Sequence, residues 1–380
     1  FTMMALWAFA RYRGGKARYL VLSSFFLVVA STFKTVVVFP FAAFFFYLLI
    51  FPFTEGEGKM TDRAARLRRL ALFLLPGFVV WGGVFGYFAL KGTFPEFWEA
   101  VFVYNRYYAE SVGGNVWDLL ADPENLLLKP LKGVWPLVLL SAVWLPLSRV
   151  AYGPLRRSFF ILLVLGTFIA VAGPGQFFAH YYQLLLPPLV VMSALFFFEF
   201  DLAGYIARKE FPLRAWLVTL IFLLTVTCFV RNQAAYLRMS PEEISARKYG
   251  HTGGFIRPRR LANYIKKVTR PCDTIYEWGA ETGLYYYSKR KAASGIFFIY
   301  PLLVGPEEER LRKADRLLDD LTASPPTLFV WSKRYAELRE RGIYDFVRER
   351  YDLVNRYRGY DVYRRKDTAT PEGDGGDGGC

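Results

Sequence analysis

Long apolar segments alternate with short polar ones along the chain as far as Val230. A membrane-spanning helix needs about 20 mostly apolar residues. The apolar segments predict seven spans and one partial span, at 1–10 (partial), 19–33, 35–53, 70–90, 134–150, 158–174, 184–200 and 214–230. The pattern therefore predicts an α-helical polytopic membrane protein with about seven to eight spans, and it assigns residues 1–230 to the transmembrane region.

The longest apolar segment runs from Tyr19 to Phe53, which is too long for one span. Lys34 interrupts this segment, and Pro40 follows. We therefore expect a tight helical hairpin with Lys34 near its turn. Because charge is costly at membrane depth, a lysine at the edge of a span is a candidate for a functional role.

Beyond Val230 the pattern changes to shorter alternating elements. "DTIYEWG" (273–279) and "PTLFVW" (326–331) predict strands, and "PEEERLRKADRLLDDL" (306–321) begins with the proline and acidic residues typical of a helix start. "YDLVNRYRGYDVYRR" predicts a hairpin around Gly359. These elements predict a small α/β domain over residues 231–365, followed by a disordered tail over 366–380. The domain carries no catalytic signature, and His251 lies alone in a loop.

Composition and charge agree with a membrane protein. The chain is 54% hydrophobic, above the usual 45–50% of soluble domains, and its net charge is +15. With the partial span entering the cytoplasm, the inner loops and their flanks carry about 15 Lys and Arg residues against about 5 in the outer turns. The positive charge is thus explained by membrane orientation rather than by nucleic acid. Cys228, Cys272 and Cys380 fit neither a disulfide framework nor a metal site.

This orientation predicts a multi-pass protein of the plasma (inner) membrane whose C-terminal domain is extracytoplasmic. The outer loop 91–133 then holds apolar residues at helical spacing, which predict an amphipathic helix along the membrane surface, at Phe94, Phe97, Trp98, Val101 and Phe102. Asn105, Arg106, Tyr107 and Tyr108 come at its end. Two interpretations of Arg106 stay open: its side chain extends to water, or it faces an anionic headgroup.

A second outer turn, "GPGQFFAHYYQ" (173–183), carries no Lys or Arg. It holds one of the two histidines of the chain, His180, followed by Tyr181, Tyr182 and Gln183. Tyrosines at the membrane interface are commonly anchors, so either tyrosine alone fits an aromatic belt. The complete polar and aromatic set favours a binding site on the same side as Lys34.

Four segments together resemble membrane glycosyltransferases of the GT-C superfamily. They are "ASTFKTVVVFPF" (30–41), "GYFALKGTFPEFWEAVFVYNRYYAE" (86–110), "FFAHYYQLLLPPLVVMSA" (177–194) and "ANYIKKVTRPCDTIYEWGAETGLYYYSKRKAASGIFF" (262–298). They resemble, in order, the helical hairpin with a central Lys, the segment along the outer interface, the His-Tyr turn and the soluble C-terminal domain. The chain is most similar to family 39, the protein-mannosyltransferase-like or aminoarabinose-transferase-like group, over most of residues 19–365.

The resemblance implies transfer of a sugar from a polyprenyl-phosphate carrier to a lipid, glycan or protein acceptor on the extracytoplasmic face. Lys34 and Arg106 would meet the donor phosphate, since Lys acts as a point charge and Arg pairs bidentately with phosphate. His180 would assist proton transfer or position the donor by hydrogen bonds. The predicted substrate-binding residues are Lys34, Asn105, Arg106, Tyr108, His180, Tyr181, Tyr182 and Gln183. No metal ligand is assigned.

In such enzymes the catalytic acid lies in the first outer loop. This chain starts at Phe1 with what reads as the tail of an apolar span, so the base is expected upstream and the chain is expected to be inactive alone. Glu96, Glu99 and Glu110 read as ordinary solvated carboxylates. Two non-enzymatic alternatives stay open: a flippase or exporter of lipid-linked oligosaccharides, and a membrane scaffold.

Overall fold

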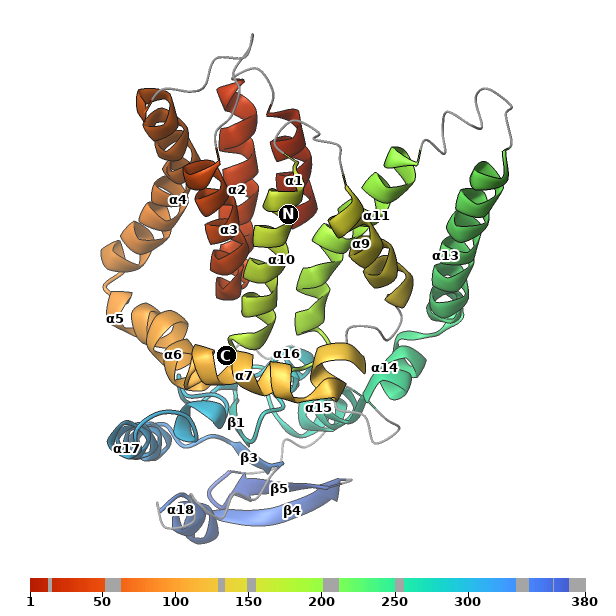
Figure 1. Cartoon of the computed structure of the whole chain (residues 1–380). Helices are drawn as coiled ribbons and strands as arrows, with labels where there is room; N and C mark the ends of the chain where they lie inside the picture. Colours follow the sequence, from red (N-terminus) through yellow and green to blue (C-terminus); the bar gives the residue numbers. More distant parts are fainter. Residues whose placement is uncertain are drawn as a thin grey trace. The chain divides into compact units, whose positions relative to one another are not determined.

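The computed structural model describes residues 1–12, 16–51, 63–128, 134–148, 155–200, 212–249, 256–332, 342–357 and 359–368. The chain divides into two compact units, Phe1–Ala234 and Ala235–Cys380, which we describe separately (Figure 1). The first unit is helical, and the second contains a small sheet.

The helices of the first unit follow one another with few connecting residues. They are α1 (Thr2–Arg11), α2 (Ala17–Phe33), the 3-10 helix η1 (Thr35–Val37), α3 (Val38–Ile50), α4 (Arg63–Leu90), α5 (Phe94–Trp98), the π-helix η2 (Glu99–Val103), α6 (Tyr104–Ala109), α7 (Val112–Ala121), the π-helix η3 (Glu124–Leu128), α9 (Trp135–Leu147), α10 (Arg157–Ala172), the 3-10 helix η4 (Tyr181–Leu185), α11 (Leu186–Glu199) and α13 (Leu213–Arg238).

Three helical segments of the described chain are long and apolar enough to cross a membrane: Arg63–Leu90, Tyr181–Glu199 and Ala215–Arg238. Four further apolar helices have only 10–17 residues. The sequence prediction of seven to eight spans is therefore too high by this criterion. The reason is that apolar residues continue past the helix ends. For example, α2 stops at Phe33 because Lys34 adopts an extended conformation, with φ −150° and ψ 109°.

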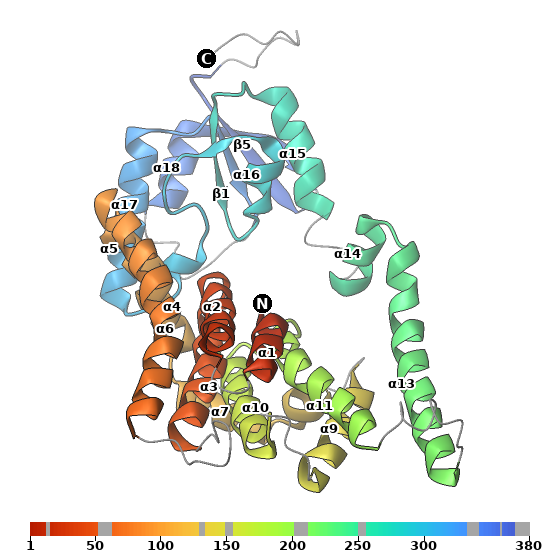
Figure 2. The ribbon, with the colours of Figure 1, turned by 90° about the horizontal axis from the view of Figure 1, so that it is seen from above.

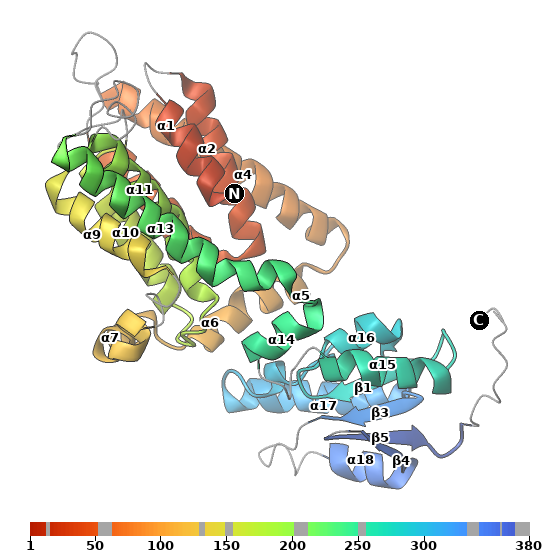
Figure 3. The same cartoon turned by 90° about the vertical axis from the view of Figure 1, so that its right-hand side faces the viewer.

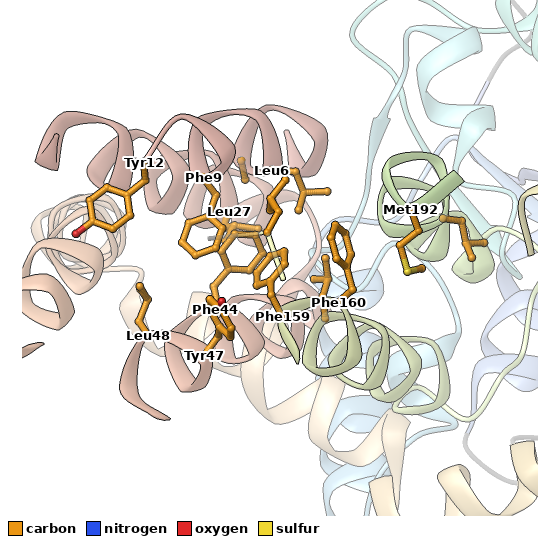
Figure 4. Close-up of a cluster of buried hydrophobic side chains, with 14 of the residues drawn as sticks. Leu6, Phe9, Tyr12, Leu27, Phe44, Tyr47, Leu48, Phe159, Phe160 and Met192 are labelled. Atoms are coloured by element: carbon orange, nitrogen blue, oxygen red, sulfur yellow. The ribbon is translucent and has the colours of Figure 1, made fainter. Parts of the chain in front are cut away.

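Aromatic side chains fill the core of the first unit. The rings of Phe9, Phe44 and Phe159 are fully buried, and their centroids lie 4.8–4.9 Å apart (Figure 4). Such tilted and edge-to-face contacts add to the stabilisation from burial of apolar area. At Gly166 the backbone of α10 comes so close to α3 that a Cβ atom would lie 2.7 Å from the Phe39 carbonyl oxygen.

Helix α2 lies between α1 and α4, and buried serines hold both contacts (Figures 1 and 2). The Ser23 hydroxyl donates to the Ala5 carbonyl over 2.9 Å, and the Ser24 hydroxyl donates to the Phe73 carbonyl. These bonds satisfy hydroxyl groups that would otherwise be costly to bury. The position of α4 beside α2 matters for the site, because the two helices share a cavity.

The second unit is a layered α/β structure. Its elements are α14 (Pro241–Tyr249), α15 (Ile256–Val268), β1 (Thr274–Trp278), α16 (Gly283–Ser288), β2 (Lys291–Ala292), η5 (Tyr300–Leu302), α17 (Glu307–Ala323), β3 (Leu328–Trp331), α18 (Ile343–Arg350), β4 (Tyr351–Tyr357) and β5 (Tyr360–Arg365). The strand order is β2-β1-β3-β5-β4. Strand β1 is parallel to β2 and β3, and β5 is antiparallel to β3 and β4.

Alternating side chains of the strands build two cores on opposite faces of this sheet. Ile275 and Leu328 face α15 and α16, whereas Tyr276 and Phe329 face α17 and α18. Figure 3 shows α15 and α16 on one side of the strands and α18 on the other. The predicted hairpin at Gly359 is confirmed: this residue has φ +98°, and β4 and β5 pair antiparallel beside it.

The carboxyl ends of β1 and β3 meet at a buried carboxylate. Glu277 is fully buried, accepts a hydrogen bond from the Ser332 hydroxyl, and accepts another from the Glu281 amide over 3.1 Å. Gly279 lies so close that a Cβ atom there would overlap both Ser332 Oγ and Glu277 Oε1. This position therefore requires glycine.

Cys228 is a free cysteine and Cys272 takes part in a disulfide, whereas the sequence predicted no disulfide framework. The sequence pattern around them carried no signal for it. His251 and most of the predicted tail, residues 369–380, lie outside the described residues.

Candidate functional site

A cavity of about 820 Å³ lies in the first unit. Its walls come from α2, η1, α3, α4, η2, α6 and the first residue of α7. The turn before η4 and the first residue of η4 complete them. Most of its lining side chains are aliphatic or aromatic, among them Phe39, Phe78 and Phe102. A cavity of this size and character is typical of a binding site for an apolar ligand or for the apolar part of one.

Glycines of α4 create much of this space. Gly77 and Gly82 both line the cavity. A Cβ atom at Gly77 would contact Val28 of α2 at 3.8 Å, whereas a Cβ atom at Gly82 would meet nothing within 4 Å. Gly77 therefore lies where α2 comes close to α4, and Gly82 leaves open volume. A Cβ atom at Gly82 would therefore meet no steric clash at the edge of the cavity.

The loop after α4 folds back on that helix. Gly92, with φ +69°, lies in the turn after α4. Phe97 then stacks on Phe88 with a centroid distance of 4.2 Å, and Phe102 lies 5.9 Å from the Trp81 ring. The apolar face predicted for this segment thus packs in part against α4, where it closes one side of the cavity.

Lys34 lies at the junction of α2 and η1 and lines the cavity. Its Nζ atom is 3.7 Å from the centroid of the Tyr181 ring, a close cation–π contact. The residue is half-buried, and this burial lowers the pKa of its ammonium group. None of the ion pairs in the described part of the chain involves Lys34.

Helix α6 brings a second cation and two more predicted residues to the cavity. Asn105, Arg106 and Tyr108 all line it. The Asn105 amide donates to the Val101 carbonyl over 2.7 Å, which fixes its side chain. Arg106 is exposed at this edge, so its guanidinium is accessible to a charged ligand headgroup.

The turn 173–183 separates into two parts with different surroundings. Tyr181 lines the cavity, and the exposed His180 stacks on it at a centroid distance of 4.6 Å. Tyr182 is buried in the opposite direction and donates its hydroxyl hydrogen to the Asn125 carbonyl over 2.7 Å. Gln183 is exposed and does not line the cavity. The structure therefore gives Tyr182 a packing contact, and it places His180 beside the cavity rather than in its wall.

Asn115 of α7 fixes this turn, although the sequence gave no reason to single it out. Its amide donates to the carbonyl oxygens of Gly173 (2.8 Å) and Ala109 (2.6 Å). Gly175 has φ +70°, and a Cβ atom there would lie 2.8 Å from the Asn115 side chain. Ser31 and Trp81 were also missed: the Trp81 indole donates to the Ser31 hydroxyl over 3.0 Å across the cavity wall.

The charge of the cavity has one sign. Among the described residues of its lining, Lys34 and Arg106 are charged and none is Asp or Glu; Glu96, Glu99 and Glu110 lie elsewhere. Within the described ranges, no three His, Cys, Asp or Glu side chains gather where they could hold a metal ion. The chemistry of the lining suits an amphiphilic anion, because the long apolar wall matches a lipid tail and the two cations match a phosphate.

Comparisons of the chain with protein-family models, with curated proteins and with solved structures find no match.

Proposed function

We propose that this protein is an integral-membrane glycosyltransferase of the GT-C type. In this proposal the cavity binds a polyprenyl-phosphate-linked sugar, and the sugar passes to a lipid, glycan or protein acceptor on the extracytoplasmic face. The observation that carries the proposal is the lining of the cavity, whose described residues form an apolar wall with two cations and no carboxylate. The family resemblance of the four sequence segments supports the same chemistry.

The charges of the cavity lining support an anionic ligand. Burial removes water from the half-buried Lys34 ammonium group, and its cation–π contact with Tyr181 replaces that hydration only in part. A phosphate at Lys34 and Arg106 would supply a charged partner. As the glycosidic bond breaks, negative charge grows on the leaving phosphate, and fixed cations stabilise that charge.

The other predicted residues keep subsidiary roles in the proposal. Tyr181 holds the Lys34 ammonium against its ring, and Asn105 and Tyr108 offer polar groups at the same edge. His180 and Gln183 are exposed beside the cavity, where they could contact the sugar or the acceptor. We assign no base, since none of the described residues that line the cavity is a carboxylate.

The proposal includes the finer topology of seven to eight spans. Five helices would cross the membrane in addition to the three long ones, namely α1, α2, α3, α9 and α10. Helices shorter than the bilayer are accommodated by local thinning of the lipid. In this topology Lys34, the segment 91–128 and the turn at His180 share the extracytoplasmic side with the second unit.

The test is equilibrium binding of a labelled polyprenyl-phosphate sugar to the protein in nanodiscs. The wild-type protein should bind the donor, and Arg106→Gln should weaken binding. Lys91→Gln is the matched control, because Lys91 is an exposed lysine at the end of α4 that does not line the cavity. If the donor does not bind, or if both variants behave alike, the proposal is wrong.

Two further experiments distinguish a transferase from a flippase. Movement of an intact fluorescent donor across the bilayer of proteoliposomes would favour the flippase, whereas the transferase predicts no such movement. Transfer is measured as passage of label from donor to acceptor. Lys34→Ala and His180→Ala should each lower that rate. Full activity of both variants would contradict the assignment of the site.

A further inference from the structure

Helix α15 of the second unit presents a cationic face to solvent. The exposed positions of the helix are Arg259, Arg260, Asn263, Lys266 and Lys267, and the exposed Arg270 follows shortly after the helix end. Only Asn263 among these six residues is uncharged. At 100° per residue the five positions within the helix fall within about one third of its circumference, and Arg270 follows just beyond the helix end. Residues 256–270 contain no acidic side chain. We call these six residues the α15 stripe.

Packing fixes the direction in which the α15 stripe faces. Leu261, Ala262 and Ile265 of the same helix are fully buried against the sheet. Because they occupy the opposite side of the helix, the charged residues cannot rotate inward without exposing this core. The stripe is therefore a fixed surface of the folded unit.

The helix end does not need these exposed cations. Carbonyl groups in the last turn of a helix are commonly satisfied by basic side chains. Here two other arginines do this: Arg290, which is buried, donates to the Thr269 carbonyl over 2.8 Å, and Arg364 donates to the Val268 carbonyl over 2.9 Å. Capping thus leaves the exposed side chains of Lys266 and Arg270 unexplained.

Ion pairs within the unit do not explain the stripe either. Arg259 pairs with Glu242 of α14 at 2.8 Å, and both side chains are largely exposed. Such a pair contributes little to stability. Among the described ion pairs, none involves Arg260, Lys267 or the other two cations of the stripe.

The opposite helical layer has the opposite charge. Helix α17 packs on the other face of the sheet and carries six acidic and four basic side chains. The unit is therefore electrically polarised from one layer to the other. A polarised domain is oriented by a charged surface, because one face is attracted and the other repelled.

We propose that the α15 stripe docks on the anionic phospholipid headgroups of the membrane in which the first unit resides. Residues 239–255 connect the last candidate span to α15, and a chain of that length reaches at most about 60 Å. The bilayer surface is thus held at high effective concentration near the stripe. Each Lys or Arg at an anionic surface raises the docked population by about fivefold. This proposal does not depend on the glycosyltransferase function.

The test uses the full chain in nanodiscs and measures acylation of Lys266 by an amine-reactive ester, read by mass spectrometry. Discs of phosphatidylcholine alone are compared with discs that contain one third phosphatidylglycerol. Docking predicts that Lys266 reacts about five- to tenfold more slowly in the anionic discs, and that high salt removes the difference. The exposed Lys366 beyond β5 is the internal control, because an anionic surface also lowers local pH for every lysine.

Two multiple variants decide the result. Arg260→Gln/Lys267→Gln/Arg270→Gln should abolish the lipid dependence at Lys266, while Arg312→Gln/Arg316→Gln on α17 should keep it. Equal Lys266 rates in the two kinds of disc would overturn the proposal, as would an equal slowing of Lys366. Protection that appears only after a soluble polyanion such as RNA is added would also overturn it, and would indicate a nucleic acid partner instead.

Discussion

Replacing Lys34 by Gln should change ligand binding and stability in opposite directions. The Lys34 ammonium is half-buried in the lining of an apolar cavity, and it lies against an uncharged ring, that of Tyr181. A charge-assisted contact with phosphate contributes roughly 1.5–3 kcal/mol. Loss of that contact corresponds to roughly 10- to 150-fold weaker binding of a polyprenyl phosphate. Native mass spectrometry of lipid-bound protein in detergent measures this ratio.

Without ligand, the same substitution should leave the free energy of unfolding unchanged or raise it. Burial lowers the pKa of Lys34, so the unfolded chain holds the proton more tightly than the folded one. The free energy of unfolding should therefore rise as pH rises through the lowered pKa toward the ordinary value of 10.5. Because Lys34→Gln removes this cost, the empty variant should be at least as stable as the wild type in thermal unfolding. A variant that is clearly less stable and binds the lipid normally would show that Lys34 is a structural residue.

Three further substitutions test the cavity, the packing beside it and, separately, the sheet of the second unit. Gly82→Phe should fill the cavity and abolish lipid binding, while Gly83→Phe, at an exposed neighbour outside the lining, should bind normally in the same native mass spectra. Tyr182→Phe loses a hydrogen bond to a backbone carbonyl and should lower the free energy of unfolding by about 1 kcal/mol; an unchanged value would argue against that bond. Gly279→Ala should cost roughly 1–3 kcal/mol in urea unfolding, because the new methyl overlaps a buried carboxylate and hydroxyl, whereas Gly295→Ala, in open space, should stay within about 0.5 kcal/mol.

The sequence pattern located the helix junction at Lys34 and the hairpin at Gly359 more accurately than it predicted the number of membrane spans. Lys34 and Gly359 mark a junction and a hairpin in the structure, since a charge in an apolar run and a glycine between strands have strong local effects. The span count exceeds the three long apolar helices of the described chain because hydropathy does not distinguish apolar helix from apolar loop. Helix α9, for example, ends after 13 residues at Leu147, before the predicted span does.

The candidate site was predicted only in part. Lys34, Arg106 and Tyr181 were expected on one side of the membrane, and the structure brings all three to one cavity. The inward direction of Tyr182 could not be predicted, because adjacent tyrosines in a turn carry no periodic signal. The hydrogen bond from Trp81 to the wall of α2 depends on the register between two helices, which local sequence does not encode.

The most direct test of the cavity as a lipid-phosphate site is photo-cross-linking. A polyprenyl phosphate with a photoreactive tail is activated on the protein, and the adducts are mapped by mass spectrometry. We predict adducts on α4 around Gly77–Phe85 and on η2. Unlabelled polyprenyl phosphate should suppress these adducts at concentrations at least about tenfold lower than neutral polyprenol requires. Adducts spread over the exposed outer surface of α13, or equal displacement by the phosphate and the alcohol, would contradict the account.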